Sequence, residues 1–194
     1  LSVEPLAPRD HVDPNERSSA TRSGADGKFE FLGLKAGDYR LHAQPWLMAS
    51  PLDLAKRDGK PTLVIFEQKV CAGCDEMHAE GFPRPEVAAL LQRYRAARVD
   101  IAANEVLKTP NGKSLAMRDW ARQLKIAYTP SFVFFDAGGR EVFRVEGYLR
   151  PFHLASSLDY VASGAYRKQP EFQRFIEARA AARREHGEPI DLMQ

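Results

Sequence analysis

The chain contains two cysteines, Cys71 and Cys74, which lie three positions apart and directly follow an apolar run and a short polar turn. A scaffold held together by disulfides spreads four or more cysteines through its sequence, so this chain must fold around a hydrophobic core of its own. Its 194 residues, 44% of them hydrophobic, suffice for one domain of about 100 to 150 residues with extensions. The close spacing of the cysteines therefore indicates a reactive pair and not a disulfide that only stabilises the fold.

Composition argues against two classes of partner. Lys and Arg total 28 against 26 Asp and Glu, a net charge of +2, so no overall field favours nucleic acid. The longest apolar runs, residues 62–66 and 131–135, are far shorter than the roughly 20 residues that span a bilayer, so we expect no membrane insertion. The chain begins at Leu1 without an initiator Met, which leaves both a removed signal peptide and a shortened start open.

The middle of the chain alternates apolar runs with helical patterns. Strands are predicted at residues 62–66, 97–101, 131–135 and 141–148, and helices at 52–57, at 71–79, after Pro85, from Ser114 and from Pro151. The last two strands are separated only by turn residues and form a hairpin. This order predicts an α/β fold with a central mixed sheet flanked by helices.

Both ends differ from this pattern. Residues 1–27 are rich in Pro, Asp, Ser and Arg, and we expect little regular structure there. Residues 28–32 and 38–42 alternate apolar and polar side chains on either side of turn glycines, which predicts a β-hairpin. Residues 170–186 predict an amphipathic helix with Phe172, Phe175 and Ile176 on its apolar side.

The cysteine pair is placed for disulfide chemistry. Cys71 is predicted at the N-terminus of a helix, where free N–H groups and the helix dipole favour a thiolate, the nucleophilic form of cysteine. Cys74 lies one turn further along, in reach of a mixed disulfide formed at Cys71. Lys69 supports ionisation of Cys71, whereas Asp75 and Glu76 oppose it, so the net direction of the shift in its pKa stays open.

Thr129 and Pro130 stand immediately before a predicted strand. A proline there donates no ladder hydrogen bond and can be cis, in which case it would face Cys71, and an ordinary trans proline is the alternative that only the family resemblance given next makes less favoured. The segment Cys71–Ala72–Gly73–Cys74 after an apolar strand, Thr129–Pro130, and Gly147 after the hairpin resemble the thioredoxin family.

This resemblance covers about residues 52–163 and implies a thioredoxin-like fold that exchanges disulfides through Cys71 and Cys74 without a cofactor. It also implies a substrate-binding groove at Ala72, Gly73, Thr129 and Pro130. We accordingly predict an N-terminal extension with a β-hairpin at 1–44, a thioredoxin-like domain at 45–164, and a C-terminal helical extension at 165–194.

A narrower resemblance is to the SoxW-type bacterial thioredoxins, which are generally exported. It rests on residues 66–68, 77–78, 129–136 and 147–149. It implies a periplasmic reductase of protein disulfides, kept reduced by a membrane electron donor of the DsbD or CcdA kind. Thioredoxin has a buried Asp where this chain has Ile65, so the proton of Cys74 must be handled differently. Our hypothesis is that Glu67 accepts it.

The alternative is a metal site. Cys71 and Cys74 are half of a typical set of four ligands, and His78 on the same helix is a third candidate, which fits a copper-binding or chaperone module. Because the chain has no second cysteine pair, disulfide exchange is the favoured interpretation, and His78 is predicted to be a surface residue of the helix.

Overall fold

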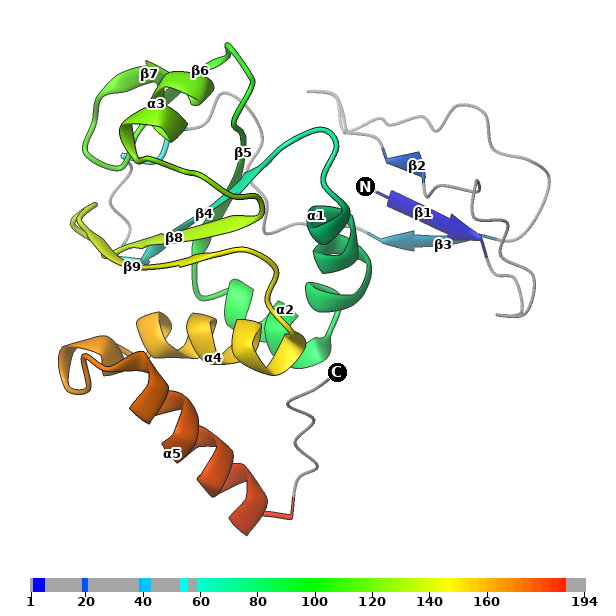
Figure 1. The fold of residues 1–194 in the computed structure, drawn as a ribbon, viewed down its shortest axis with the longest axis vertical. Coiled ribbons are helices and arrows are strands. Elements are labelled where there is room, and N and C mark those ends of the chain that lie inside the picture. The colour runs from blue at the N-terminus through cyan, green and yellow to red at the C-terminus, as the bar shows by residue number, and fades with distance from the viewer. Residues whose placement is uncertain (1, 6–18, 21–38, 43–52, 56–58, 188–194) are drawn as a thin grey trace. The chain divides into compact units, whose positions relative to one another are not determined.

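The computed structural model describes residues 2–5, 19–20, 39–42, 53–55 and 59–187, which fall into two units, Leu1–Pro45 and Trp46–Gln194. In the first unit, β1 (Ser2–Pro5), β2 (Ser19–Ala20) and β3 (Tyr39–His42) form an antiparallel sheet in the order β2-β1-β3 (Figure 1). The prediction of little regular structure in residues 1–27 was therefore wrong at β1 and β2. Their partners are distant in sequence, so local composition does not reveal the pairing.

The predicted N-terminal hairpin is only partly covered by the described residues. Its second arm is β3, which pairs with β1 from Ser2↔His42 through Pro5↔Tyr39. Its first arm, residues 28–32, lies outside the described residues.

The second unit is built on a four-stranded mixed sheet in the order β5-β4-β8-β9. Its strands are β4 (Thr62–Glu67), β5 (Arg95–Asp100), β8 (Ser131–Phe135) and β9 (Glu141–Glu146). β4 runs parallel to β5, and the pairs β4–β8 and β8–β9 are antiparallel. Every residue of β4 and β8 is buried, as continuous apolar runs in the middle of a sheet require.

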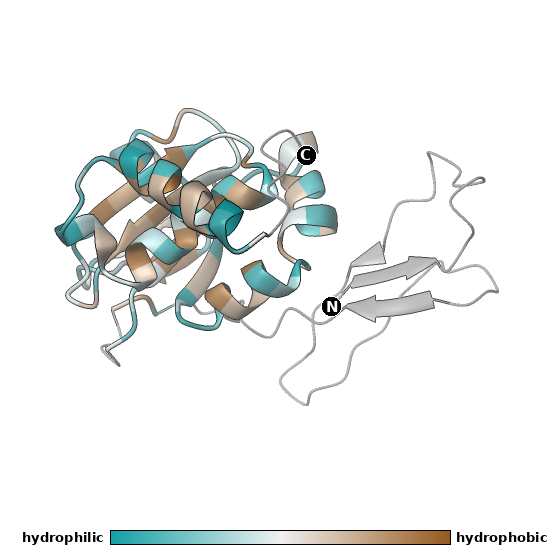
Figure 2. Cartoon of the chain, turned by 90° about the horizontal axis from the view of Figure 1, so that it is seen from below, coloured by the Kyte–Doolittle hydropathy of each residue, from teal (hydrophilic) through white to brown (hydrophobic). Residues whose placement is uncertain are grey.

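Helices cover both faces of this sheet (Figure 1). Leu63 and Ile65 point to the face that carries α1 (Ala72–Glu76), the π-helix η2 (Met77–Gly81), α2 (Pro85–Leu91) and α4 (Pro151–Ala162). Val64 and Phe66 point to the other face and pack with α3 (Met117–Gln123). Figure 2 shows mostly hydrophobic strands, and helices in which hydrophobic and hydrophilic residues alternate. The predicted α/β fold with a flanked mixed sheet is confirmed.

Two predicted helices differ in the structure. Residues Ser114–Ala116 form strand β7, which pairs with β6 (Val106–Lys108), so the helix expected from Ser114 begins only at Met117. The backbone hydrogen bonds of this segment are made with the neighbouring strand β6. The periodicity of side chains in the sequence does not reveal such a pairing. Of the helix expected at 52–57, the described residues 53–55 form a β-bridge to Lys108 and a turn.

The chain continues through the short 3₁₀ helix η3 (Ala165–Arg167) into α5 (Phe172–Glu185), which confirms the predicted C-terminal helix. The ring of Phe172 lies 4.7 Å from that of Phe143 and 5.0 Å from that of Tyr160, between ring centroids. α5 is thereby packed onto α4 and the sheet. Within the described residues, none of the helices has both the length and the apolar character needed to cross a bilayer.

Candidate active site

Cys71 is the N-cap residue of α1. Its backbone is extended, and its Sγ accepts a hydrogen bond from the backbone N–H of Cys74 at 3.2 Å. Its carbonyl oxygen accepts from the N–H groups of Cys74 and Asp75, both at 3.0 Å. The sulfur therefore takes the place of the oxygen acceptor that usually caps a helix, at the positive end of the helix dipole. This position stabilises a thiolate on Cys71 when the pair is reduced.

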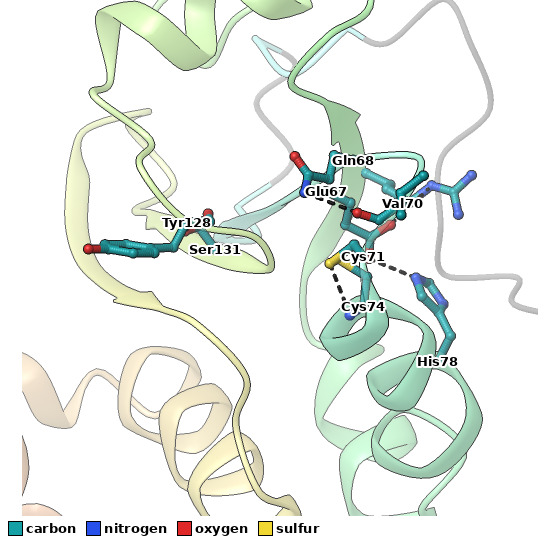
Figure 3. The surroundings of a disulfide bond; sticks show 9 residues. Glu67, Gln68, Val70, Cys71, Cys74, His78, Tyr128 and Ser131 are labelled. Atoms are coloured by element: carbon teal, nitrogen blue, oxygen red, sulfur yellow. Dashed lines mark hydrogen bonds and ion pairs between the residues drawn. A yellow bond between two sulfur atoms is a disulfide. The ribbon is translucent and has the colours of Figure 1, made fainter.

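Cys71 and Cys74 are joined by a disulfide with a Cα–Cα distance of 5.2 Å (Figure 3). Cys71 is 7% exposed and Cys74 is 3% exposed. From its place at the start of the helix Cys71 was expected to be exposed, but both cysteines are buried, because the loops around them cover the disulfide. A partner must therefore reach the sulfur of Cys71 through a restricted approach.

Pro130 lies opposite the cysteine loop, and the Thr129–Pro130 peptide bond is cis, as expected. A Cβ atom built on Gly73 would stand 3.3 Å from Cδ of Pro130 and 3.6 Å from Cβ of Tyr148. The N–H of Gly147 donates to the carbonyl oxygen of Pro130 at 2.8 Å, which ties the two loops together. The structure thus brings Gly73 and Pro130 into contact, while Ala72 is exposed and Thr129 half-buried beside them.

Exposed hydrophobic side chains flank these loops. Val70, next to Cys71, is 86% exposed, and Tyr128, next to Thr129, is 67% exposed. With Tyr148, they are three of the four large hydrophobic side chains that the described part of the chain leaves exposed. Exposed apolar side chains next to the cysteine and proline loops are candidates for contact with another molecule.

Tyr148 also carries a polar group into this surface. Burial raises the pKa of Tyr148, and a hydrogen bond to Glu76 together with the negative charges of Glu76 and Glu80 raises it further. The phenol therefore stays protonated at neutral pH and donates to the carboxylate of Glu76. This contact links the loop after β9 to the helix that carries the cysteines.

Glu67 ends β4 as a buried carboxylate beside the cysteine loop. Its Oε1 lies 2.7 Å from Nε2 of His78 (Figure 3), and its Oε2 lies 3.5 Å from Nε of Arg98. His78, predicted to be a surface residue of the helix, is half-buried, since its side chain pairs with Glu67 and its ring packs edge-on against Phe82 at 5.0 Å. Side chains alternate along β4, so Glu67 shares with Ile65 the face that η2 covers.

The metal-site alternative lacks a ligand cluster. Within the described residues, no group of three or more His, Cys, Asp or Glu side chains is gathered closely enough to hold a metal ion. The two cysteines are bonded to each other, and Nε2 of His78 is directed at Glu67. The three residues proposed as copper ligands therefore do not converge on one point.

Comparison with known proteins agrees with this geometry. The thioredoxin-like domain family matches residues 48–162. The chain belongs to this family. The thioredoxin-like match spans both cysteines, Glu67, His78 and the loop of Pro130. No curated protein is similar enough in sequence to match the chain.

The chain is similar to several solved structures, of which the first shows the same fold. A thioredoxin-fold protein from Helicobacter pylori is 16% identical, with a TM-score of 0.58 over 71% of this chain and 90% of that chain. A thioredoxin from Thermus thermophilus is 29% identical, with a TM-score of 0.43 over 56% of this chain and 78% of that one. The oxidised C-terminal domain of DsbD from Neisseria meningitidis is 20% identical, with a TM-score of 0.41 over 52% and 78%.

Two features of this thioredoxin-like site were missed in the sequence. The Glu67–His78 pair joins residues that are eleven positions apart. One signal for it was present, because His78 follows Cys74 by four residues and so faces the same side of the helix. The contact of Tyr148 with the helix that carries the cysteines has no comparable signal in the sequence, because it depends on the path of the loop after β9.

Proposed function

We propose that this thioredoxin-like protein is a thiol-disulfide oxidoreductase that reduces disulfides of protein substrates. The observation that carries the proposal is the Cys71–Cys74 pair in the first turn of a helix, with Cα atoms 5.2 Å apart and Sγ of Cys71 at the N-cap. This arrangement supplies a thiolate and, one turn away, a second thiol that displaces the partner.

The reaction proceeds in two exchanges. The Cys71 thiolate attacks one sulfur of a substrate disulfide, which forms a Cys71–substrate disulfide and releases the other substrate sulfur as a thiolate. Cys74 then gives up its proton, with Glu67 as the proposed acceptor, and its thiolate attacks Sγ of Cys71. The mixed disulfide breaks, the second substrate thiolate leaves, and the Cys71–Cys74 disulfide forms. The substrate has gained two electrons, and the protein has lost two.

The surface around the cysteines favours a polypeptide as the substrate. The exposed Val70 and Tyr128 add apolar area on either side of the opening at Cys71. A small polar disulfide would use neither side chain, whereas an extended segment of a protein would contact both. In this proposal Ala72, Gly73, Thr129 and Pro130 form the floor of the groove that holds the segment.

We further propose that the protein works in the periplasm and receives electrons from a membrane donor of the DsbD or CcdA kind. The support is the resemblance of residues 66–68, 77–78 and 129–136 to the SoxW-type thioredoxins. The cellular test is thiol trapping with an alkylating reagent. The Cys71–Cys74 pair should be trapped reduced in exporting cells and oxidised in cells that lack the donor.

The biochemical test is reduction of insulin by the purified protein with dithiothreitol as the electron source. Cys71→Ser should abolish the activity, because the attacking thiolate is lost. Cys74→Ser should accumulate a mixed disulfide that mass spectrometry identifies at Cys71. Equilibration with glutathione should give a reduction potential of about −270 mV, which is typical of a reductase. A value of about −120 mV would contradict the proposal that the protein reduces its substrates. Full activity of Cys71→Ser would contradict the proposal as a whole.

A further inference from the structure

Glu67 is the one acidic side chain that is buried in the described part of the chain. A buried carboxylate requires partners that satisfy its oxygens, and two are present. His78 reaches Oε1 from the helix side, and Arg98 reaches Oε2 from β5. The neighbouring carboxylate across the sheet, Asp100, accepts from the N–H of Ala102 in its own loop at 2.8 Å.

The helix that carries the cysteines also places His78 near Cys74. α1 and η2 follow each other without a break from Ala72 to Gly81, and His78 stands four residues after Cys74, so the two residues occupy successive turns of one face. The edge-on contact with Phe82, which is itself buried, fixes the imidazole ring. The nitrogen that meets Glu67 is therefore held in a defined position.

The burial of these side chains limits where a proton can go. Cys74 is 3% exposed and the side chain of Glu67 is 8% exposed, whereas the side chain of His78 is 21% exposed. The guanidinium of Arg98 has donors and no acceptor, so it can hold the carboxylate but cannot accept a proton from it. His78 is the partner of Glu67 whose ring offers both an acceptor and a donor nitrogen and whose side chain is partly exposed.

We propose that His78 carries the proton of Glu67 to solvent during resolution of the mixed disulfide. Glu67 takes the proton from the Cys74 thiol, and the resulting carboxylic acid passes it from Oε1 to Nε2 of His78 in the neutral tautomer that carries its proton on Nδ1. The imidazolium releases the Nδ1 proton to water, which leaves the Glu67 carboxylate accepting from Nε2–H, and exchange of the ring protons with water restores the starting tautomer before the next turnover. The proton balance closes when the departing substrate thiolate takes up a proton from solvent. This inference rests on the proposed function, and it assigns His78 as a positioning and proton-transfer residue behind Glu67.

The test separates the two exchanges in rapid-mixing experiments with the reduced full-length protein and a peptide disulfide. The attack step is measured in a Cys74→Ser background, where the reaction stops at the mixed disulfide. The resolution step is measured with both cysteines present, as release of the second peptide thiol. His78→Gln keeps an N–H donor for Glu67 but cannot carry a proton, and His78→Ala opens a space for imidazole from the buffer. His186→Gln, at the far end of α5, is the matched control.

We expect His78→Gln and His78→Ala to slow the resolution step about tenfold or more between about pH 6 and pH 8. The rate of the attack step should not change. A tenfold loss is of the size that removal of a general acid–base group can cause. Added imidazole should accelerate His78→Ala and leave His78→Gln unchanged. His186→Gln should behave as wild type in both steps. Resolution at the wild-type rate in His78→Gln would overturn the inference, as would equal slowing of both steps or the absence of rescue by imidazole. Failure of the proposed function is distinct, because the Cys74→Ser protein with His78 intact would then form no mixed disulfide.

Discussion

At the scale of single residues, the two positions between the cysteines have different surroundings. The side chain of Ala72 is exposed, whereas Gly73 lies against Pro130 and Tyr148. Both residues belong to the first turn of α1, where an alanine would ordinarily be preferred to a glycine by about 1 kcal/mol. The glycine at position 73 is therefore explained by space and not by helix propensity.

This contact predicts the effect of Gly73→Ala. The new methyl group would lie 3.3 Å from Cδ of Pro130, which forces the proline loop outward and narrows the approach to Cys71. We expect insulin reduction to fall about fivefold or more, while the free energy of unfolding changes by less than about 1 kcal/mol because the gain in helix propensity offsets the crowding. Chemical denaturation and the insulin assay measure the two quantities.

Ala72→Gly is the matched control for this substitution. It should lower the free energy of unfolding by up to about 1 kcal/mol and leave insulin reduction near the wild-type rate, because it alters the helix without touching the proline loop. If Gly73→Ala reduced insulin as fast as wild type, the close approach of Gly73 and Pro130 would not limit access to Cys71.

At the scale of elements, the hydrophobic pattern of the sequence predicted the strands and helices whose burial follows from their own residues. The apolar runs of β4 and β8 and the helix after Pro151 are visible in the sequence because burial on both faces, or on one helical face, dictates them. Strand β7 was mistaken for the start of a helix, because its hydrogen bonds go to β6 and its own side chains carry no alternation long enough to show it. The Glu67–His78 contact was missed for the same reason, since it joins a strand end to a helix.

Tyr94 provides a prediction at this scale, because it joins the start of β5 to α4. Its buried phenol donates to the carbonyl oxygen of Leu158, and its ring packs edge-on against Phe134 at 5.8 Å. Burial raises the pKa of Tyr94 far above the ordinary value of 10.0. The unfolded chain therefore loses this proton first, so the stabilising effect is complete below about pH 10 and is lost as the pH rises further.

We accordingly expect the free energy of unfolding to fall steeply above about pH 10, and Tyr94→Phe to flatten that fall. At neutral pH the same variant should be less stable than wild type by about 1 kcal/mol, because one buried hydrogen bond is lost. Urea denaturation at neutral and alkaline pH measures both effects. Tyr128→Phe, which alters an exposed phenol, should leave the wild-type slope intact. A Tyr94→Phe variant with that same slope would contradict the assignment.

At the scale of the whole molecule, the two ends of the chain are related differently to the thioredoxin-like domain. The N-terminal sheet belongs to a unit of its own, which ends at Pro45. α5 belongs to the same unit as the active site, where Arg179 forms ion pairs with Asp159 of α4 and Glu86 of α2. The division of the chain at residues 44 and 164 stays a prediction, and stability measurements on shortened chains test it.

Removal of residues 1–45 should leave the remaining chain folded, with insulin reduction near that of the full protein, because the described core clusters of the second unit are formed by residues from Leu54 onward. Removal of residues 165–194 should be costly, because it takes away the buried Ile176 and uncovers the aromatic rings of Phe143 and Tyr160. At about 1.5 to 3 kcal/mol for each large apolar side chain withdrawn from the core, we expect a loss of about 3 kcal/mol or more. Thermal unfolding followed by circular dichroism compares the two shortened chains with the full one. If the C-terminal truncation proved the more stable of the two, α5 would be a peripheral addition and the packing of Phe172 against Phe143 would contribute little to the fold.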